Sequence, residues 1–288
     1  MPTVSRHGSA GNTKLRTATY LRGMFSKPQM AVKYARYWLH ASNGKGHGVH
    51  SPFVFDFIVS VLNDAKVYPC YQQVEAARRA LLQNEQVLNI DDFGAGSRVI
   101  TTRQRVVKAI AQSSLKPAKY SQLLFRMVQY YKPATVVELG TSLGITAAYL
   151  ASGNNTTKVV TMEGAAEVAA VARDTFSKLQ LSNIQLIQGN FDETLQPALQ
   201  QVKQVDLVFI DGNHRYEPTV RYFKELLQFA GADSMIILDD IHWSEEMEQA
   251  WHEVQQHPQV TMTIDLFFIG IVLFKPEFKI KQHFTVRF

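Results

Sequence analysis

The sequence predicts an α/β fold: a doubly wound, mostly parallel sheet of seven strands that ends in an antiparallel hairpin, with a helical extension at the N-terminus. From residue 133 onward, short runs of Val, Ile and Leu alternate with amphipathic segments, as in a parallel sheet buried on both faces. The last two apolar runs are too close together for a crossover helix, so they should pair antiparallel. Before residue 133, apolar residues recur at helical spacing instead.

Residues 1–28 are predicted to form a flexible basic tail, and residues 29–132 a helical region that acts as a lid and selects the substrate. The tail is rich in Ser, Thr, Gly, Lys and Arg and lacks the apolar stretch of a secretory signal. Ser51 followed by Pro52 is typical of a helix N-cap with proline at the first helical position. Helices are expected at 30–41, 52–64, 74–84 and 121–131.

Residues 133–288 are predicted to form the ligand-binding α/β domain. Five strand–helix units in about 110 residues are typical of a doubly wound sheet. Strands are expected at 135–139, 158–163, 184–188, 205–211, 234–240, 260–267 and 268–275. Helices are expected at 145–151, 166–181, 193–201, 217–230 and 244–256.

The composition bounds the location and the partners. No run of eighteen apolar residues occurs, so neither a membrane-spanning helix nor a membrane partner is expected. The single cysteine excludes an intrachain disulfide framework and fits a reducing cytoplasm. The sequence does not decide the oligomeric state, a homodimer included.

Charge is distributed unevenly along the chain. Residues 1–132 carry 19 basic and 6 acidic side chains, a net charge of +13, while residues 133–288 carry 11 basic and 19 acidic, a net charge of −8. The basic half either recruits an anionic partner such as nucleic acid or docks on the acidic half. The basic residues are dispersed rather than interleaved with aromatic ones, which favours docking.

Two glycine-rich turns compete as the nucleotide-binding loop. The turn at 136–146 follows a predicted strand, opens a predicted helix and has Glu163 at the end of the next strand, where ribose hydroxyls are usually bound. The turn at 89–99, with the DFGAGS sequence at 92–97, has no acidic residue in the following twenty and no following strand. We therefore expect the turn at 136–146 to bind a nucleotide cofactor and the turn at 89–99 to be a capped turn that leads into a helix. The alternative for the turn at 89–99 is that it packs over the site, with Arg98, Arg103 or Arg105 facing the ligand.

The residues of the favoured turn suit a ligand with polar groups. Gly140 and Gly144 would let the backbone approach the ligand without a Cβ clash, and Thr141 and Ser142 offer hydroxyls. Glu138 ends the strand that leads into the turn.

The E-x-G-x-x-x-G turn, the acidic strand ends and the terminal hairpin together resemble class I S-adenosylmethionine-dependent methyltransferases. The resemblance covers roughly residues 120–275 and implies a Rossmann-like methyltransferase fold with S-adenosylmethionine as cofactor. By this resemblance Glu138 and the Gly140–Gly144 loop hold the methionine moiety, and Glu163 holds the ribose. Asn190 and Phe191 stand where the family often has an aspartate that contacts adenine, so Asn190 is a departure.

Carboxylates gather after the fourth and fifth strands. Asp211 follows one strand, and Asp239 and Asp240 follow the next. Because the carboxyl ends of parallel strands converge on one crevice, these side chains should lie close together and repel one another. A divalent ion with oxygen ligands, such as Mg²⁺, Mn²⁺ or Ca²⁺, would resolve the repulsion.

Here the resemblance narrows to the metal-dependent catechol and caffeoyl-CoA O-methyltransferases, which place metal ligands at the positions of Asp211, Asp239 and Asp240. Asp240 replaces their usual Asn, and His214 stands where they have a lysine. The D-G-x-H run also resembles a bacterial methyltransferase group with histidine at this point. The resemblance implies that a metal at Asp211 orients the acceptor hydroxyl and that His214 takes its proton, with His242 as the second candidate base or an extra ligand.

The leading functional prediction is metal-assisted O-methylation of a small hydroxylated substrate. One alternative is methylation of RNA or protein by way of the basic N-terminal half. Another is a non-catalytic scaffold that binds the cofactor without turnover. No motif for methylation of a base nitrogen occurs, so nucleic acid is the less favoured substrate.

Overall fold

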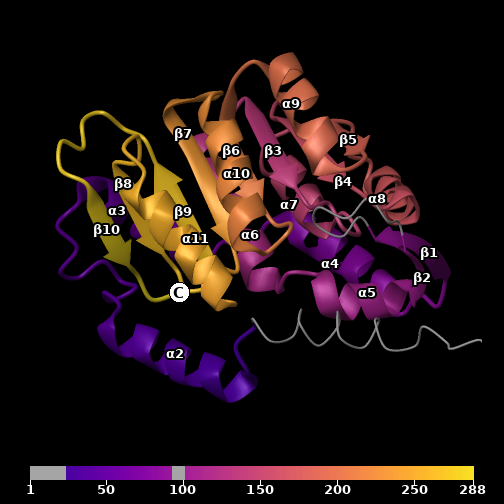
Figure 1. The fold of residues 1–288 in the computed structure, drawn as a ribbon, viewed down its shortest axis with the longest axis horizontal. Helices are drawn as coiled ribbons and strands as arrows, with labels where there is room; N and C mark the ends of the chain where they lie inside the picture. The colour runs from indigo at the N-terminus through magenta and orange to yellow at the C-terminus, as the bar shows by residue number, and fades with distance from the viewer. Residues whose placement is uncertain (1–23, 93–100) are drawn as a thin grey trace, which may run out of the picture.

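The computed structural model describes residues 24–92 and 101–288, and their main feature is an eight-stranded sheet with helices on both faces (Figure 1). The strands lie in the order β10-β8-β9-β7-β6-β3-β4-β5. The five strands from β7 to β5 in this order are parallel and correspond to the predicted ones. They are β3 (Thr135–Leu139), β4 (Lys158–Glu163), β5 (Ile184–Gln188), β6 (Val205–Ile210) and β7 (Ala230–Asp239).

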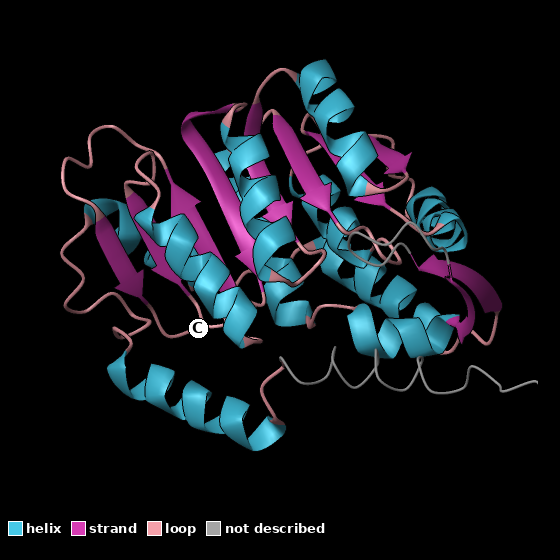
Figure 2. Ribbon diagram, viewed as in Figure 1, coloured by secondary structure: helices cyan, strands magenta, loops and turns pink. Residues whose placement is uncertain are grey.

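Alternate residues of these strands point to two separate apolar layers. Val136, Phe209 and Ile237 pack with helix α6 (Ala118–Tyr131), whereas Val137 and Val208 pack with the helices of the other face. That second face carries α9 (Phe191–Val202), α10 (Tyr216–Leu227) and α11 (Glu245–Gln256), which lie in front of the sheet in Figure 2. The remaining crossover helices are α7 (Ile145–Gly153) and α8 (Ala166–Lys178). Burial on both faces explains why the strand sequences are nearly continuous Val, Ile and Leu.

The predicted terminal hairpin is present, and the sheet gains one strand beyond it. Strand β8 (Met262–Asp265) pairs antiparallel with β9 (Ile269–Leu273), which in turn pairs antiparallel with β7. Strand β10 (Gln282–Thr285) then adds parallel to β8 and makes eight strands in place of the predicted seven. Only four residues of mixed polarity form β10, too short a pattern to mark a strand in the sequence.

The N-terminal extension contributes helices at the expected places. Ser51 caps α3 by accepting a hydrogen bond from the Val54 N–H, and α3 continues into a π-helical turn, η1. Helix α6 leads into β3 as predicted, while α2 lies along the lower edge of the view in Figure 1 and packs through Tyr37 against Phe267. The other described elements of this region are α2 (Lys27–His40), α3 (Pro52–Asp56), η1 (Phe57–Leu62), α4 (Pro69–Leu82) and α5 (Val107–Ser114).

The extension is not wholly helical, because a two-stranded antiparallel hairpin interrupts it. Strand β1 (Val87–Asp92) pairs with β2 (Thr101–Val106). The prediction that no strand follows the glycine turn at 89–99 was therefore wrong. The arginine-rich stretch is strand β2, and its alternation of Arg and Gln or Thr was misread as helical. Gly94, Gly96 and Arg98 lie outside the described residues, and so does the predicted role of the DFGAGS turn.

Within residues 24–92 and 101–288, no helix is both long and apolar enough to cross a membrane.

Candidate active site

Three loops meet where β3, β6 and β7 end. Each contains one non-glycine residue in the left-handed region, Ser142 with φ 47°, Asn213 with φ 54° and Asp240 with φ 52°. Such conformations cost about 1–2 kcal/mol each and persist where the surrounding structure enforces them, as at ligand sites. The strained backbone therefore marks the same crevice that the sequence predicts.

The glycines of the β3 loop are required by the protein's own packing. A Cβ on Gly140 (φ 104°) would lie 2.1 Å from the Asp211 carbonyl oxygen. A Cβ on Gly144 (φ 86°) would lie 2.7 Å from the Phe176 ring. The close contacts that both glycines allow within the protein are with the loop after β6 and with α8. The predicted close approach of a ligand to the same glycines stays a prediction. Gly140 thus lets the β3 and β6 loops touch, which brings Asp211 next to the predicted cofactor loop.

Glu138 is a fully buried carboxylate with one free oxygen. Thr161 donates a hydrogen bond to Oε2, while Oε1 has no hydrogen-bond partner among the described residues. Burial raises the pKa of Glu138 well above its ordinary value, and the charges of Asp211 and Glu163 add to the effect. A buried acceptor without a donor is costly, so this oxygen suits a ligand that brings an N–H or O–H.

Glu163 ties the end of β4 to the cofactor loop. Ser142 N–H donates to Glu163 Oε2 and Ala165 N–H donates to Oε1, each at 2.9 Å. Thr141, buried beside Thr161, shares a hydroxyl hydrogen bond with it. Each carboxylate oxygen of Glu163 can accept a further hydrogen bond, so the pair of Glu138 and Glu163 fits a cofactor with an ammonium group and ribose hydroxyls.

Asn190 and Phe191 follow β5 and begin α9. Asn190 caps that helix by accepting a hydrogen bond from Asp192 N–H at 3.2 Å. The Phe191 ring lies against Gly212, where a Cβ would come within 2.7 Å of it, and packs edge-on to Tyr222. Phe191 therefore lies beside the β6 loop, in agreement with its predicted place at the site.

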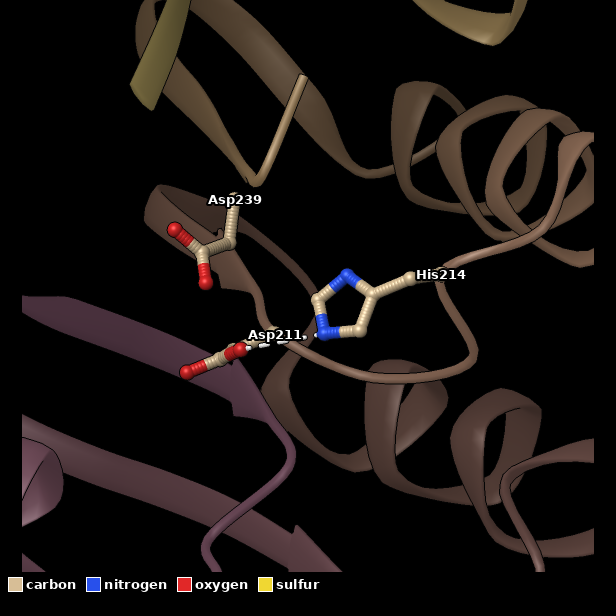
Figure 3. Close-up of side chains that lie close together, drawn as sticks. All are labelled: Asp211, His214 and Asp239. Carbon is tan, nitrogen blue, oxygen red and sulfur yellow. Dashed lines mark ion pairs between the residues drawn. The ribbon is translucent and has the colours of Figure 1, made fainter. Parts of the chain in front are cut away.

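Asp211, His214 and Asp239 form a cluster of titratable groups (Figure 3). His214 Nε2 lies 3.5 Å from Asp211 Oδ1. Burial raises the pKa of Asp211 to about 7, assisted by the charge of Asp239. Burial alone would lower the pKa of His214, but the hydrogen bond and charge of Asp211 raise it to about 9. Asp211 and His214 therefore gain or lose protons at neutral to alkaline pH, which suits general acid–base catalysis.

Asp240 lies beside this cluster but is not one of its members. Its backbone N–H donates to the Phe268 carbonyl and its own carbonyl accepts from Trp243 N–H, so the residue shapes the β7 loop. Burial and the charge of Asp239 raise the pKa of Asp240 to about 6. Of the three predicted metal ligands, the structure brings two together and adds His214.

Lys116 is the functional residue that the sequence analysis missed. It lies in the linker between α5 and α6, its side chain is 7% exposed, and its ammonium group forms an ion pair with Asp239 Oδ2. Burial alone would lower the pKa of Lys116, but the charges of Asp239, Asp211 and Asp240 raise it well above its ordinary value. The sequence predicts that the three carboxylates need a cation beside them. Nothing in the sequence pattern of residues 1–132, however, distinguishes Lys116 from the other lysines there.

His242 is engaged away from the Asp211 cluster. Its ring nitrogens lie 2.9 Å from Glu248 Oε1 and 2.9 Å from Asp265 Oδ2, and Lys33 of α2 binds the same glutamate. Burial alone would lower the pKa of His242, but the hydrogen bond that its ring donates to Asp265 raises it. The residue joins α2, α11 and β8 and does not lie in the Asp211 cluster.

The donor set fits a metal ion only in part. One ligand atom from each of Asp211, His214 and Asp239 lies within 4.8 Å of the others, and Asp239 Oδ1 has no hydrogen-bond partner among the described residues. Asp239 Oδ2, however, is taken by the Lys116 ammonium. A metal ion bound here would therefore have to share Asp239 with the Lys116 ammonium.

Comparison with known proteins agrees with the fold and with a methyltransferase domain. A family model described as "Methyltransferase domain" matches residues 137–241, the span from β3 to the β7 loop. An uncharacterised protein, R132 of Acanthamoeba polyphaga mimivirus, is 30% identical over 78 residues. Those residues are 25% of this chain and 35% of the relative, so the chain spans about a third of that protein's length.

Solved methyltransferase structures share the fold at low sequence identity. The SAH-bound methyltransferase PaMTH1 of Podospora anserina has a TM-score of 0.55 at 15% identity, covering 78% of this chain and 97% of its own. The O-methyltransferase of Bacillus cereus in complex with SAH has a TM-score of 0.52 at 17% identity, covering 76% and 97%. The family match confirms the predicted methyltransferase domain over residues 137–241, and the solved structures confirm its Rossmann-like fold.

Substitution of Gly140 tests the contact between the β3 and β6 loops. Gly140→Ala should lower the free energy of unfolding by about 3 kcal/mol or more, because a backbone clash adds to left-handed strain. Gly48→Ala is the matched control, with φ 78° and no atom within 4 Å of the new Cβ, and should cost only about 1–2 kcal/mol. Urea denaturation of both variants measures the difference, and equal losses would refute the contact.

Glu138→Gln should raise the melting temperature of the ligand-free protein at pH 8 by a few degrees, because burial opposes ionisation of the Glu138 carboxyl in the folded protein but not in the unfolded chain, and glutamine does not ionise in either state. Since the folded-state pKa is raised, the stability contributed by the neutral carboxyl is present below the ordinary value of 4.5 and is lost as pH rises through the folded-state value. The advantage of the variant should therefore grow from pH 5 to pH 8 in thermal scans. A gain that is independent of pH would contradict this origin.

Proposed function

Because the chain carries a methyltransferase domain, we propose that it transfers a methyl group from S-adenosylmethionine to a hydroxyl oxygen of a small molecule. The observation that carries the proposal is the contact between the Gly140 loop and Asp211, which sets a proton-accepting pair beside the predicted cofactor site. The O-methyltransferase of Bacillus cereus, which shares the fold, supports oxygen as the acceptor atom.

The cofactor would be held by the residues at the ends of β3 and β4. Glu138 Oε1 offers a buried acceptor to an ammonium group, and Glu163 offers acceptors to ribose hydroxyls. The Gly140–Gly144 loop lies between them, and Phe191 borders the site from α9. When bound, S-adenosylmethionine supplies a methyl group on a positively charged sulfur, which an oxygen nucleophile displaces in line.

The chain's own part in the reaction is to take the acceptor's proton. A neutral hydroxyl is a weak nucleophile, and a positioned base typically accelerates its reaction by about 10²–10⁴. Because Asp211, 3.5 Å away, raises the pKa of His214 to about 9, the His214 ring can receive the hydroxyl proton once it has lost its own as the pH rises toward 9. No step of this proposal depends on a metal ion, and the metal assistance implied by the resemblance stays a prediction.

The acceptor pocket would lie between the β7 loop and the N-terminal extension. Ser114 at the end of α5 hydrogen-bonds Ser142 Oγ at 2.8 Å, and Lys116 follows two residues later. Tyr216 and Trp243, 37% and 38% exposed, stand at the starts of α10 and α11. The enclosing segments come from both halves of the chain, which favours a small acceptor over RNA or a protein.

Calorimetric titration with S-adenosylmethionine tests the cofactor assignment. The wild-type protein should bind, and Glu163→Gln should weaken binding about tenfold or more by losing a charge-assisted hydrogen bond. Asp174→Asn, on the exposed side of α8, is the matched control and should bind like the wild type. Absence of binding by the wild-type protein would rule out methyl transfer and leave no role for the site as described.

The pH dependence of turnover tests the proton acceptor. As pH rises from 6 to 9, the Asp211–His214 pair loses protons and kcat should increase. His214→Gln should lower kcat by about 10²–10⁴ and flatten the rise near pH 9. His252→Gln, on α11, leaves the pair intact and should keep the wild-type profile. An unchanged profile in His214→Gln would assign the proton to another group.

A further inference from the structure

We propose that Lys116 is the built-in cation of the active site and stands in for a divalent metal ion, so that methyl transfer by this protein is metal-independent. The inference rests on the proposed function for its catalytic meaning, but the ion pair that carries it is independent of any reaction. It assigns a role in the chemistry to the N-terminal extension, which the family match does not cover.

The position of Lys116 is that of a counter-ion to the whole carboxylate group. Its ammonium pairs with Asp239 Oδ2 and lies 5.8 Å from the centre of the Phe209 ring, under the ends of β6 and β7. Both partners are almost completely buried, with side chains 7% and 2% exposed. Removal of one partner from such a pair leaves an uncompensated buried charge, so each holds the other in place.

The backbone around Lys116 is fixed by its own network. Arg78 of α4 donates from Nη1 to the Lys116 carbonyl at 2.7 Å and from Nε to Glu75 at 3.0 Å. Tyr149 of α7 donates to the same glutamate at 2.9 Å. On the other side, Ser114 is hydrogen-bonded to the cofactor loop at Ser142. The linker is therefore held by hydrogen bonds at Ser114 and at Lys116, which fixes the position of the lysine.

The positive charge of Lys116 beside the carboxylates reduces the need for a metal ion. Three carboxylates from two adjacent loops face one ammonium, and the positively charged sulfur of the proposed cofactor would bring a second positive charge to the same crevice. A divalent cation would have to approach the Lys116 ammonium, and two like charges repel in a low-dielectric site. Metal binding should therefore appear only when the lysine charge is removed.

Titration with Mn²⁺ alone, followed by electron paramagnetic resonance of the free ion, tests this. The wild-type protein should bind Mn²⁺ weakly, and Lys116→Met should bind it at least about tenfold more tightly, because the carboxylates lose their cation. Adding Asp239→Asn to Lys116→Met should abolish the gain. Lys108→Met is the matched control, since Lys108 pairs with Glu85 at the surface of α5, and it should behave like the wild type.

Turnover gives the second readout. Chelator should leave wild-type methyl transfer unchanged, while Lys116→Met should lose at least about tenfold in kcat and regain part of it with Mn²⁺. Tight Mn²⁺ binding by the wild-type protein, lost in Asp239→Asn, would overturn the proposal, and so would inactivation of the wild-type protein by chelator. If Lys116→Met does not fold, the Mn²⁺ titrations of Lys116→Gln and of the wild-type protein decide between the outcomes. A protein that fails to bind S-adenosylmethionine refutes the proposed function, yet the Mn²⁺ titrations still decide the role of Lys116.

Discussion

The site depends on the close approach of two loop backbones, those that follow β3 and β6. Gly140 and the Asp211 carbonyl are separated by less than the space a methyl group needs. Because the strands are parallel neighbours, their carboxyl ends meet at one edge, and this contact fixes the distance between them. The cofactor loop, the Asp211–His214 pair and the left-handed turns at Ser142 and Asn213 are positioned by that one constraint.

The N-terminal extension completes what the parallel sheet cannot supply. The ends of β6 and β7 bring three carboxylates together, and only His214 of the β6 loop offers them positive charge from the described part of the sheet's own loops. The linker between α5 and α6 provides a cation, Lys116, and α2 provides another through Lys33 on Glu248. Both are ion pairs between the basic and acidic halves, as expected if the halves dock on each other. Part of the uneven charge of the sequence is therefore paired within the chain.

The sequence predicted the sheet and most of the crevice because both follow from local patterns. Continuous apolar runs locate β3 to β7, and an acid or glycine at each strand end locates Glu138, Glu163, Asp211 and Asp239. It failed where the signal is tertiary. Strand β2 has an alternating pattern that a helix can also carry, and Lys116 is one of many basic residues until the fold buries it.

The roles of the glycines and of His242 show the same limit. The spacing identifies Gly140 as a special position, yet only the packed structure reveals that the Asp211 carbonyl is the neighbour that leaves no room for a Cβ there. His242 has the right residue type two positions from Asp240, but its ring turns to Glu248 and Asp265. Spacing identifies which residues can act, whereas side-chain direction decides which do.

The free protein gives up stability at the two points where ligands are expected. Glu138 Oε1 and Asp239 Oδ1 are buried acceptors without donors among the described residues, and each such atom costs on the order of 1–3 kcal/mol. Core packing alone would favour apolar groups of the same shape at both positions. Carboxylates at both positions are explained if the missing hydrogen-bond donors arrive with the cofactor and with the substrate that accepts the methyl group. The same oxygens that destabilise the ligand-free protein would then stabilise the ligand-bound one.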